Sequence, residues 1–314
     1  MNEDIEIQGL NVSFVNKGQR TQAVTDVHAR FPEGSVTGLI GESGSGKSVL
    51  GMSILQLLPK TTQVEGRCLY KGRDLYRLPE HEMKQVRGRE IALIPQNPSE
   101  SLNPIRTIGS QLTECVTVHK TQSKKEAASR RDSLLRRFGF SDVDRINRSY
   151  SFQLSGGMNQ RVISVLGLMN RPRWVIADEP TKGLDAILRR QVYQVLREIS
   201  ESETGGMIVI THDIALAGAL CSRLMVLYKG MVLEQGETRR ILEHPAHPYT
   251  QGLIGSLPEK GMRPIGRADP ERAKATEGCR FYARCPHGTK DCAERLPAEA
   301  ELSDGRLVRC CRYA

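Results

Sequence analysis

Residues 41–48 read Gly-Glu-Ser-Gly-Ser-Gly-Lys-Ser, a glycine-rich segment whose residue types and spacing suit the binding of a phosphate chain. The segment fits the pattern G-x-x-x-x-G-K-[ST] in full. Its glycines let the backbone curl tightly, so that successive N–H groups and a helix N-terminus point at phosphate oxygens. In this pattern the Lys47 ammonium reaches the β- and γ-phosphates and the Ser48 hydroxyl ligates Mg²⁺.

The flanking sequence supplies the elements that such a loop needs. An apolar stretch at residues 36–40 precedes it, and a helical pattern follows it to Leu58. A strand, loop and helix in this order distinguish a functional phosphate loop from a chance match. We therefore predict a nucleoside triphosphate site, with contacts from Gly41, Glu42, Ser43, Gly44, Ser45, Gly46, Lys47, Ser48 and Val49.

Two adjacent carboxylates, Asp178 and Glu179, follow the apolar stretch at residues 174–177. A carboxylate at a strand end can hold the metal through water, and a second one beside it can act as base for an attacking water. The same pair could instead be an acidic cap at the start of a helix. Because the chain also carries the phosphate loop, we assign Asp178 to the metal and Glu179 to the base.

Two further segments are ambiguous when each is considered by itself. Residues 154–158 read Leu-Ser-Gly-Gly-Met, where Ser155 can cap the apolar helix that follows and the glycines leave its N-terminal amides uncovered. Such a segment is also an ordinary turn and cap. His212 ends a β-branched stretch at residues 207–211, where a single histidine is more often structural than catalytic.

Strand and helix patterns alternate at both ends of residues 1–240. We expect strands near residues 5–14, 36–40, 90–94, 174–177, 207–211 and 224–228. This alternation implies a mainly parallel sheet with helices on both faces. Between the third and fourth strands we expect a helical insert, about residues 97–170, with a surface helix in the polar run 121–131. Residues 242–269 are rich in proline and glycine and favour a linker or an extended wrap.

In their order along the chain, these motifs resemble the ATP-binding cassette (ABC) ATPases over roughly residues 5–240. The resemblance implies that Phe14 stacks on adenine, that Gln96 senses Mg²⁺ and the γ-phosphate, and that His212 contacts the γ-phosphate. It implies that the nucleotide of a second subunit meets Leu154, Ser155, Gly156, Gly157 and Met158, with Asp185 in the loop that crosses the interface. The implied catalytic residues are Glu179, His212 and Gln96, and the implied Mg²⁺ contacts are Ser48, Gln96 and Asp178.

The resemblance also implies the fold, an α/β phosphate-loop (RecA-like) ABC ATPase core with an antiparallel β subdomain and a helical subdomain. We place the ATPase domain at residues 1–240 and a cysteine-rich C-terminal extension at residues 241–314. The chain departs from the family pattern at Pro95, where an aromatic residue is usual, and at Lys182-Gly183, which put a charge and a freer backbone into an interface loop. Both departures bear on coupling between subunits.

The length, the apolar runs and the net charge of the chain limit the classes of function that it can have. The 314 residues suffice for one large domain and an appendage. No run approaches the roughly 18 apolar residues of a spanning helix, and the acidic start Met1-Asn-Glu-Asp-Ile lacks a signal-peptide core. The net charge of +9 is dispersed among acids, which favours a solvated face first and a partner or membrane surface second. Aromatic residues are few, so we expect no nucleic-acid partner.

The sequence beyond residue 240 resembles the C-terminal extension of the oligopeptide, dipeptide and nickel importer ATPases. The resemblance rests on His247-Pro-Tyr-Thr250, on the block from Cys279 to Cys310, and on Ser101-Leu-Asn-Pro104. It implies an ATP-hydrolysing subunit, peripheral on the cytoplasmic face of the inner cell membrane, that powers import of peptides, nickel chelates or a related solute. The implied partners are two permease subunits, a second homologous ATPase and, indirectly, an external solute-binding protein.

Two other functions fit the ATPase motifs alone. One is a soluble ABC ATPase without a transport role, such as a nucleic-acid repair or assembly accessory protein. The other is a regulatory subunit that barely hydrolyses ATP. The C-terminal segments favour the importer, and the presence of Glu179 and His212 argues against the regulatory subunit.

Five of the eight cysteines lie between residue 279 and the C-terminus. We expect a reducing compartment for such an ATPase, which favours a metal site over disulfides. Four thiolates suit tetrahedral Zn²⁺ or a [4Fe–4S] cluster, and their spacing is wider than the usual zinc pattern. Some members of the resembled family carry an iron–sulfur cluster. We therefore expect a [4Fe–4S] cluster on Cys279, Cys285, Cys292 and Cys310, with Zn²⁺ or free thiols as alternatives and Cys311 as a spare ligand.

Overall fold

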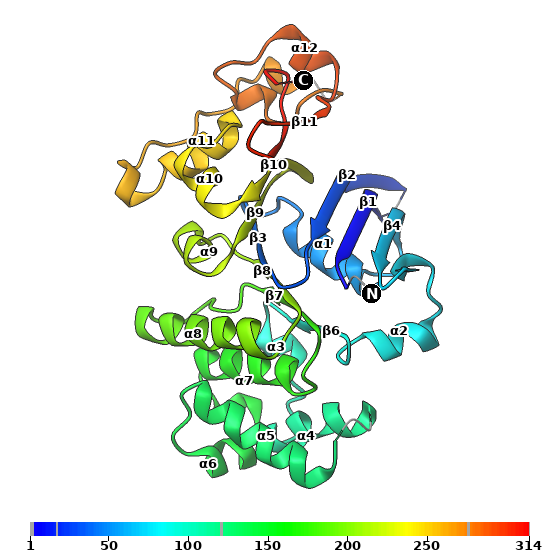
Figure 1. Cartoon of the computed structure of the whole chain (residues 1–314), viewed down its shortest axis with the longest axis vertical. Helices are drawn as coiled ribbons and strands as arrows, with labels where there is room; N and C mark the ends of the chain where they lie inside the picture. The colour runs from blue at the N-terminus through cyan, green and yellow to red at the C-terminus, as the bar shows by residue number, and fades with distance from the viewer. Residues whose placement is uncertain (1–2, 17, 120–121, 275–276, 314) are drawn as a thin grey trace.

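The structure, a computed structural model, describes residues 3–16, 18–119, 122–274 and 277–313. Along the longest axis in Figure 1, the helical insert lies at the bottom, the sheets lie in the middle and the C-terminal extension lies at the top. The first two residues and Thr121, which begins the predicted polar helix, lie outside the described residues. Within these described ranges no helix combines the length and the apolar character that crossing a membrane requires.

A four-stranded antiparallel sheet forms the β subdomain, in the order β2-β1-β4-β5. Its strands are β1 (Ile5–Asn16), β2 (Gln19–Phe31), β4 (Thr62–Tyr70) and β5 (Arg73–Asp74). The antiparallel subdomain implied by the family resemblance is therefore confirmed. Of its strands, the sequence patterns predict only β1, because β2 and β4 are rich in polar residues and leave much of their length exposed.

An eight-stranded sheet forms the centre of the molecule, in the order β11-β12-β10-β9-β3-β8-β7-β6. The strands from β9 to β6 are parallel, as predicted, whereas β10, β11 and β12 are antiparallel to their neighbours. The strands are β3 (Val36–Ile40), β6 (Ile91–Ile94), β7 (Trp174–Asp178), β8 (Gly206–Ile210), β9 (Arg223–Tyr228), β10 (Met231–Glu237), β11 (Glu299–Glu301) and β12 (Leu307–Arg309). Parallel strands end at one edge, so the residues after β3, β6, β7 and β8 gather there.

Helices outside the insert include α1 (Lys47–Ile54), α2 (Glu80–Val86), α8 (Ala186–Ser202) and α9 (Ile214–Leu220). The helix after the phosphate loop is shorter than predicted, because it ends at Ile54 and not at Leu58. Gln56 has φ 51°, a left-handed conformation that cannot continue an α-helix, and Pro59 follows soon after.

The predicted helical insert contains α3 (Pro98–Ser101), α4 (Ile108–His119), α5 (Lys124–Arg137), α6 (Val143–Arg148) and α7 (Gly156–Leu168). The start of α5 is fixed by a capping box. The Ser123 hydroxyl accepts a hydrogen bond from the Glu126 N–H, and the Glu126 carboxylate accepts one from the Ser123 N–H.

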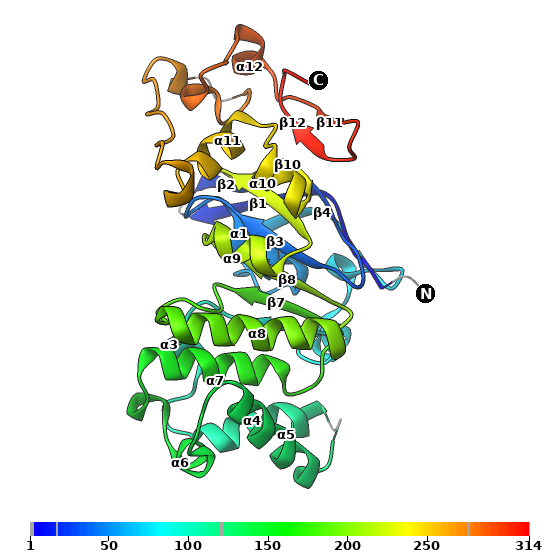
Figure 2. The same ribbon diagram turned by 60° about the vertical axis from the view of Figure 1, so that its left-hand side comes forward.

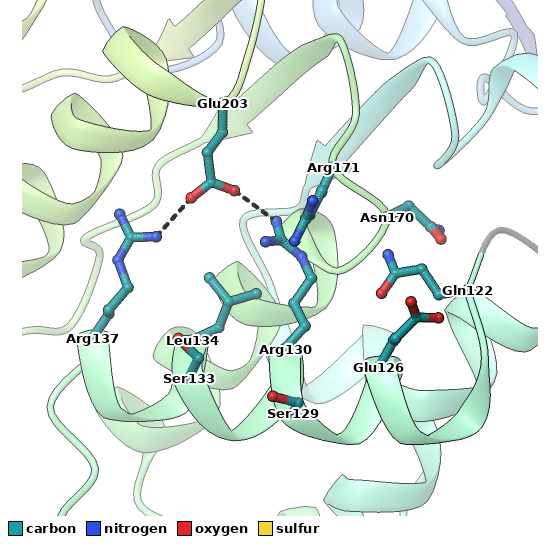
Figure 3. Close-up of a pocket in the computed structure, with 10 residues that line it drawn as sticks. All are labelled: Gln122, Glu126, Ser129, Arg130, Ser133, Leu134, Arg137, Asn170, Arg171 and Glu203. Atoms are coloured by element: carbon teal, nitrogen blue, oxygen red, sulfur yellow. Dashed lines mark hydrogen bonds and ion pairs between the residues drawn. The ribbon is translucent and has the colours of Figure 1, made fainter.

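A cavity of about 560 Å³ lies between α5 and the end of α8 (Figure 3). Two arginines of α5 point to one carboxylate there: Arg130 lies 2.9 Å and Arg137 2.7 Å from the oxygens of Glu203. Arg130 also donates to the carbonyl oxygens of Leu168 and Met169. These contacts join the helical insert to the core, and they engage two of the three arginines that line the cavity, Arg171 being the third.

The C-terminal extension contains α10 (Thr238–Glu243), α11 (Pro248–Gly255) and α12 (Lys290–Glu294). The interpretation of residues 242–269 as a linker is wrong for α11. Pro248 occupies the first turn of α11, where a missing N–H costs no hydrogen bond. The Nδ1 atom of His247 caps this helix by accepting a hydrogen bond from the Tyr249 N–H at 2.9 Å.

A buried ion pair holds the end of the chain on the main sheet. The carboxylate of Glu234, on β10, lies 3.0 Å from Nη1 of Arg306, and it also accepts hydrogen bonds from the N–H groups of Ala246 and His247. Next to it, β12 pairs with β10. The extension therefore continues the sheet of the ATPase core, and the division at residue 240 remains a prediction.

Candidate nucleotide site

The phosphate loop joins β3, in the middle of the main sheet, to α1. Gly41 and Gly46 have φ values of 147° and 96°. A Cβ atom on Gly41 would overlap the carbonyl oxygen of Leu227, and one on Gly46 would lie 2.8 Å from that of Ala23. A Cβ atom on Gly44 would have no neighbour within 4 Å. The loop is therefore held closely by neighbouring backbone, while Gly44 leaves room for a ligand.

The side chain of Lys47 folds back onto the phosphate loop. Its Nζ atom donates to the carbonyl oxygens of Gly41 at 2.8 Å and Glu42 at 2.9 Å, and its exposed fraction is 7%. Burial lowers the pKa of this ammonium group, and the nearby carboxylates, that of Glu179 first, act in the opposite direction. A phosphate anion would remove the cost of burying this charge.

Asp178 has the surroundings of a metal ligand. It ends β7, its side chain is buried, and its Oδ1 atom has no hydrogen-bond partner. Burial raises the pKa of this carboxyl group above its usual range, the charge of Glu179 adds to the effect, and a hydrogen bond with Ser48 opposes it. An orphaned, buried oxygen beside the Ser48 hydroxyl fits Mg²⁺, because a bound cation would stabilise the ionised carboxylate.

Glu179 and His212 form a pair. One carboxylate oxygen of Glu179 lies 2.8 Å from Nδ1 of His212 and accepts the His212 N–H at 3.0 Å. The other oxygen lies 3.4 Å from the Thr211 hydroxyl. Glu179 has φ 48°, a strained conformation for a residue with a side chain, and such strain is concentrated at functional sites. The structure thus brings the predicted base and the predicted γ-phosphate contact together.

A cavity of about 490 Å³ opens in front of the phosphate loop. It is lined by predicted nucleotide contacts, namely Phe14, Gly44, Ser45, Gly46, Lys47, Ser48 and Val49, and by Thr21, Gln22, Ala23, Lys229 and Arg280. Gln96 follows β6 at the same edge of the sheet, but it is exposed and does not line this cavity. Glu42 and Ser43 line a second cavity on another side of the loop.

The Leu-Ser-Gly-Gly-Met segment contributes no residue to the lining of this cavity. The Ser155 hydroxyl caps α7, Ser155 and Gly156 are exposed, and open space surrounds Gly156 where a Cβ atom would lie. Asp185 caps α8 and is also exposed. A large apolar side chain is exposed close in sequence to each cap: Phe152, near Ser155, is 72% exposed, and Ile187, near Asp185, is 82% exposed.

Sequence reasoning missed that the C-terminal extension reaches the phosphate loop. The buried Tyr249 accepts a hydrogen bond from the Glu42 N–H at 2.9 Å through its hydroxyl oxygen. Nη1 of Arg284 lies 3.0 Å from both carboxylate oxygens of Glu42. Arg280 lines the nucleotide cavity itself. The sequence shows arginines between the clustered cysteines, but this pattern does not reveal that they contact the phosphate loop.

Comparisons with known proteins agree with this geometry. Residues 24–182 match the family described as ABC transporter, and residues 233–292 match the oligopeptide/dipeptide transporter C-terminal region. The chain is 37% identical to the dipeptide transport ATP-binding protein DppD of Bacillus subtilis, over 99% of this chain and 95% of the relative. The chain belongs to the ABC transporter ATPases with an oligopeptide/dipeptide C-terminal region.

Further relatives and a solved structure extend the comparison. This ABC ATPase is 34% identical to the oligopeptide transport ATP-binding protein OppD of Escherichia coli, over 98% of this chain and 92% of that protein. It superposes with a TM-score of 0.68 on the ATP-binding cassette MJ0796, solved as a dimer in a post-hydrolysis state with ADP and Pi. That match has 25% identity and covers 75% of this chain and 99% of MJ0796.

Membership of the family establishes the coarse chemistry. The chain is an ABC-type ATPase that binds ATP with Mg²⁺. The cavity in front of the phosphate loop and the unpaired, buried oxygen of Asp178 fit these two groups.

Four cysteines in the C-terminal extension of this ABC ATPase, Cys279, Cys285, Cys292 and Cys310, are neighbours without being arranged as metal ligands. Burial raises the pKa of the Cys279 thiol to about 12, and nearby Cys292, Cys285 and Cys310 add to the effect. The Cys279 N–H donates to the Cys292 carbonyl oxygen at 2.7 Å. Within the part of the chain that the structure describes, however, no three His, Cys, Asp or Glu side chains are placed to hold a metal.

Proposed function

We propose that this ATPase powers the import of peptides through a membrane permease. The observation that carries the proposal is similarity along nearly the whole chain to ATP-binding proteins of dipeptide and oligopeptide transport, including the C-terminal region. Both of these relatives are described as transport proteins, which favours this function over that of a soluble ABC ATPase without a transport role. Nickel chelates are the alternative solute.

In the proposed site, Glu179 is the general base. His212 holds one of its carboxylate oxygens, which leaves the oxygen near Thr211 as the freer acceptor for a proton from water. Lys47 would exchange its contacts with the loop carbonyls for the β- and γ-phosphates. Ser48, Asp178 and Gln96 would hold Mg²⁺, which neutralises charge on the phosphates. Phe14 would stack on adenine.

The site is incomplete in one chain. Residues Leu154–Met158 and Asp185 lie away from the cavity lining, so we assign them to the nucleotide of a second, homologous ATPase subunit. Closure of such a sandwich around ATP, and its release after hydrolysis, would move two attached permease subunits. We infer from this proposal that the protein acts at the cytoplasmic face of the membrane, with an external solute-binding protein as an indirect partner.

Uptake of a labelled dipeptide by cells tests the transport proposal. Cells that depend on this chain for uptake should lose it with Lys47→Ala, because the variant lacks the cation for phosphate. Lys84→Ala, at an exposed position on α2, is the matched control and should transport normally. Accumulation of radioactive nickel in place of peptide would reassign the solute. Normal uptake of both without the chain would remove the transport function.

We also propose a [4Fe–4S] cluster on Cys279, Cys285, Cys292 and Cys310. The support is chemical: four neighbouring thiols on one small unit supply the donors that the cluster requires. Burial of Cys279 keeps its thiol protonated until a metal displaces the proton, so binding and local ordering should be linked. Zn²⁺ is the alternative occupant.

Iron and sulfide content after purification without oxygen tests this second proposal. The full chain should contain both, and Cys285→Ser should lose the visible absorption of the cluster while still binding ATP. Cys115→Ser, in the helical insert, is the control and should keep the cluster. About one zinc per chain with no iron would reassign the site. An ordered extension without metal would contradict any metal site.

A further inference from the structure

Arg280 belongs to the C-terminal extension but lies at the nucleotide cavity. It lines the same cavity as Phe14 and the phosphate-loop residues Gly44 to Val49. Its Nη1 atom donates to the Lys229 carbonyl oxygen at 2.6 Å, and its Nη2 atom donates to the Thr25 hydroxyl at 2.8 Å. The guanidinium therefore bridges the turn after β9 and strand β2 at the rim of the cavity.

The turn that Arg280 holds is itself attached to the phosphate loop. The Gly230 N–H donates to the Ser45 carbonyl oxygen at 2.9 Å, and the Thr25 N–H donates to the Gly230 carbonyl oxygen at 2.8 Å. A Cβ atom on Gly230 would overlap the backbone of Ala23. Because this packing leaves little freedom to the turn, the position of Arg280 beside the loop is well defined.

The charge of Arg280 has no counterpart in the described part of the chain. Its guanidinium donates hydrogen bonds to a carbonyl and a hydroxyl oxygen, and burial lowers its pKa with no carboxylate to offset the effect. Three other arginines of the extension that reach the core each meet a carboxylate, in the pairs Arg284–Glu42, Arg306–Glu234 and Arg309–Asp26. A half-buried guanidinium without an acid, at the rim of a phosphate-binding cavity, is suited to an anionic ligand.

Residues of the extension other than Arg280 also hold it in place beside the phosphate loop. Arg284 contacts Glu42, and Phe281 packs edge-on against Tyr228 and Tyr249 with ring centroids 5.3 and 5.4 Å apart. Tyr249 in turn accepts the Glu42 N–H. Phe281 and Arg284, which follow Arg280 along the chain, are thus anchored in the core, which keeps the Arg280 side chain at the cavity.

We propose that Arg280 is a phosphate-contacting residue of the nucleotide site, so that the C-terminal extension supplies part of the ATP-binding machinery. The ligand is the phosphate chain of a nucleoside di- or triphosphate. The inference rests on the ATP site proposed above and adds a cation from outside the ATPase motifs.

The test is the affinity of the purified full chain for Mg-ATP, Mg-ADP and AMP, measured by calorimetry. Arg280→Gln should weaken ATP and ADP binding by about tenfold or more, because a hydrogen bond to a charged group is lost. AMP, with one phosphate, should be affected less. Arg280→Lys retains the charge and should recover most of the ATP affinity. Arg295→Gln, at an exposed arginine of the same extension, should bind as the unaltered chain does.

The outcomes separate this inference from the ATP site itself. If Arg280→Gln binds ATP with unaltered affinity, the inference is wrong. If Arg280→Lys loses as much as Arg280→Gln, the arginine only bridges Lys229 and Thr25, and the phosphate contact is also wrong. If the unaltered chain binds no ATP, the proposed nucleotide site fails. The far-ultraviolet circular dichroism spectrum without nucleotide should be the same for each variant, which excludes misfolding as the cause.

Discussion

The carboxylate of Glu179 is restrained by its immediate neighbours. The His212 ring and the backbone N–H of the same residue both contact one oxygen, and the Thr211 hydroxyl lies near the other. The left-handed backbone at Glu179 is a further restraint. Such a carboxylate can accept a proton with little reorganisation, which is what a general base requires.

Replacement of Glu179 tests this assignment. Glu179→Gln should retain Mg-ATP binding, because the phosphate loop is untouched, and should lower ATP turnover by roughly 10²–10⁴-fold, since the proton acceptor is lost. Turnover is measured in the assembled complex, with Glu100→Gln, at an exposed position after β6, as the control. Undiminished hydrolysis would remove Glu179 from the role of base.

Individual site residues were predictable where a motif identified their chemistry. Asp178, Glu179 and His212 come together as strand-end positions of a parallel sheet should. The bond between Glu179 and His212 could not be predicted, because sequence order does not determine how side chains at adjacent strand ends are oriented. The exposure of Gln96 could not be predicted either, because it depends on the conformation of the loop after β6.

Among the elements, α11 connects the end of the main sheet to the phosphate loop. Its cap, His247, is 1% exposed, and its ring packs edge-on against Phe281 with centroids 5.7 Å apart. Burial lowers the pKa of His247 from 6.5 to about 3. The neutral ring accepts the Tyr249 N–H, and Tyr249 accepts the Glu42 N–H, so the cap supports the loop indirectly.

The buried cap predicts a pH dependence of stability. Between pH 6.5 and about 3 the unfolded chain binds a proton at His247 that the folded chain does not, so acid favours unfolding there. The stabilisation is complete above pH 6.5 and is lost as the pH falls. His247→Asn keeps a cap acceptor but cannot titrate. Its unfolding free energy, measured by denaturant between pH 7 and 5, should fall less steeply, by up to about 1 kcal/mol per pH unit.

A control and a contrary result complete this prediction. His81→Asn, on the exposed side of α2, should keep the slope of the unaltered chain. If His247→Asn also keeps that slope, His247 titrates normally in the folded protein and the buried cap is wrong.

Helices and strands with a clear hydrophobic pattern or a known motif could be predicted, whereas helices and strands without either could not. The central parallel strands are continuous apolar runs, buried on both faces, and their positions follow from the sequence. Strand β4 is exposed over most of its length, and its pairing with β1 comes from a distant part of the chain. The proline-rich composition of residues 242–269 hid α11, because proline is compatible with a helix only in its first turn.

At the scale of the whole molecule, the C-terminal extension and the ATPase core form one structure. Contacts such as Tyr249–Glu42 and Arg284–Glu42 join residues that are more than 200 positions apart. No local pattern predicts contacts of this kind, since they arise from the packing of the finished sheet. In our proposal the exposed Ser155–Gly156 segment closes the nucleotide site of a second subunit, so that one chain carries half of a nucleotide sandwich.

We propose that this ATPase drives peptide import together with partner subunits. Its most direct test is ATP hydrolysis by the chain alone and by the complex with two permeases and the second ATPase in liposomes. We expect slow hydrolysis by the mainly monomeric chain, and faster hydrolysis and peptide uptake by the complex when peptide-loaded binding protein is added. Hydrolysis that is unaffected by permeases and peptide but stimulated by nucleic acid would contradict it.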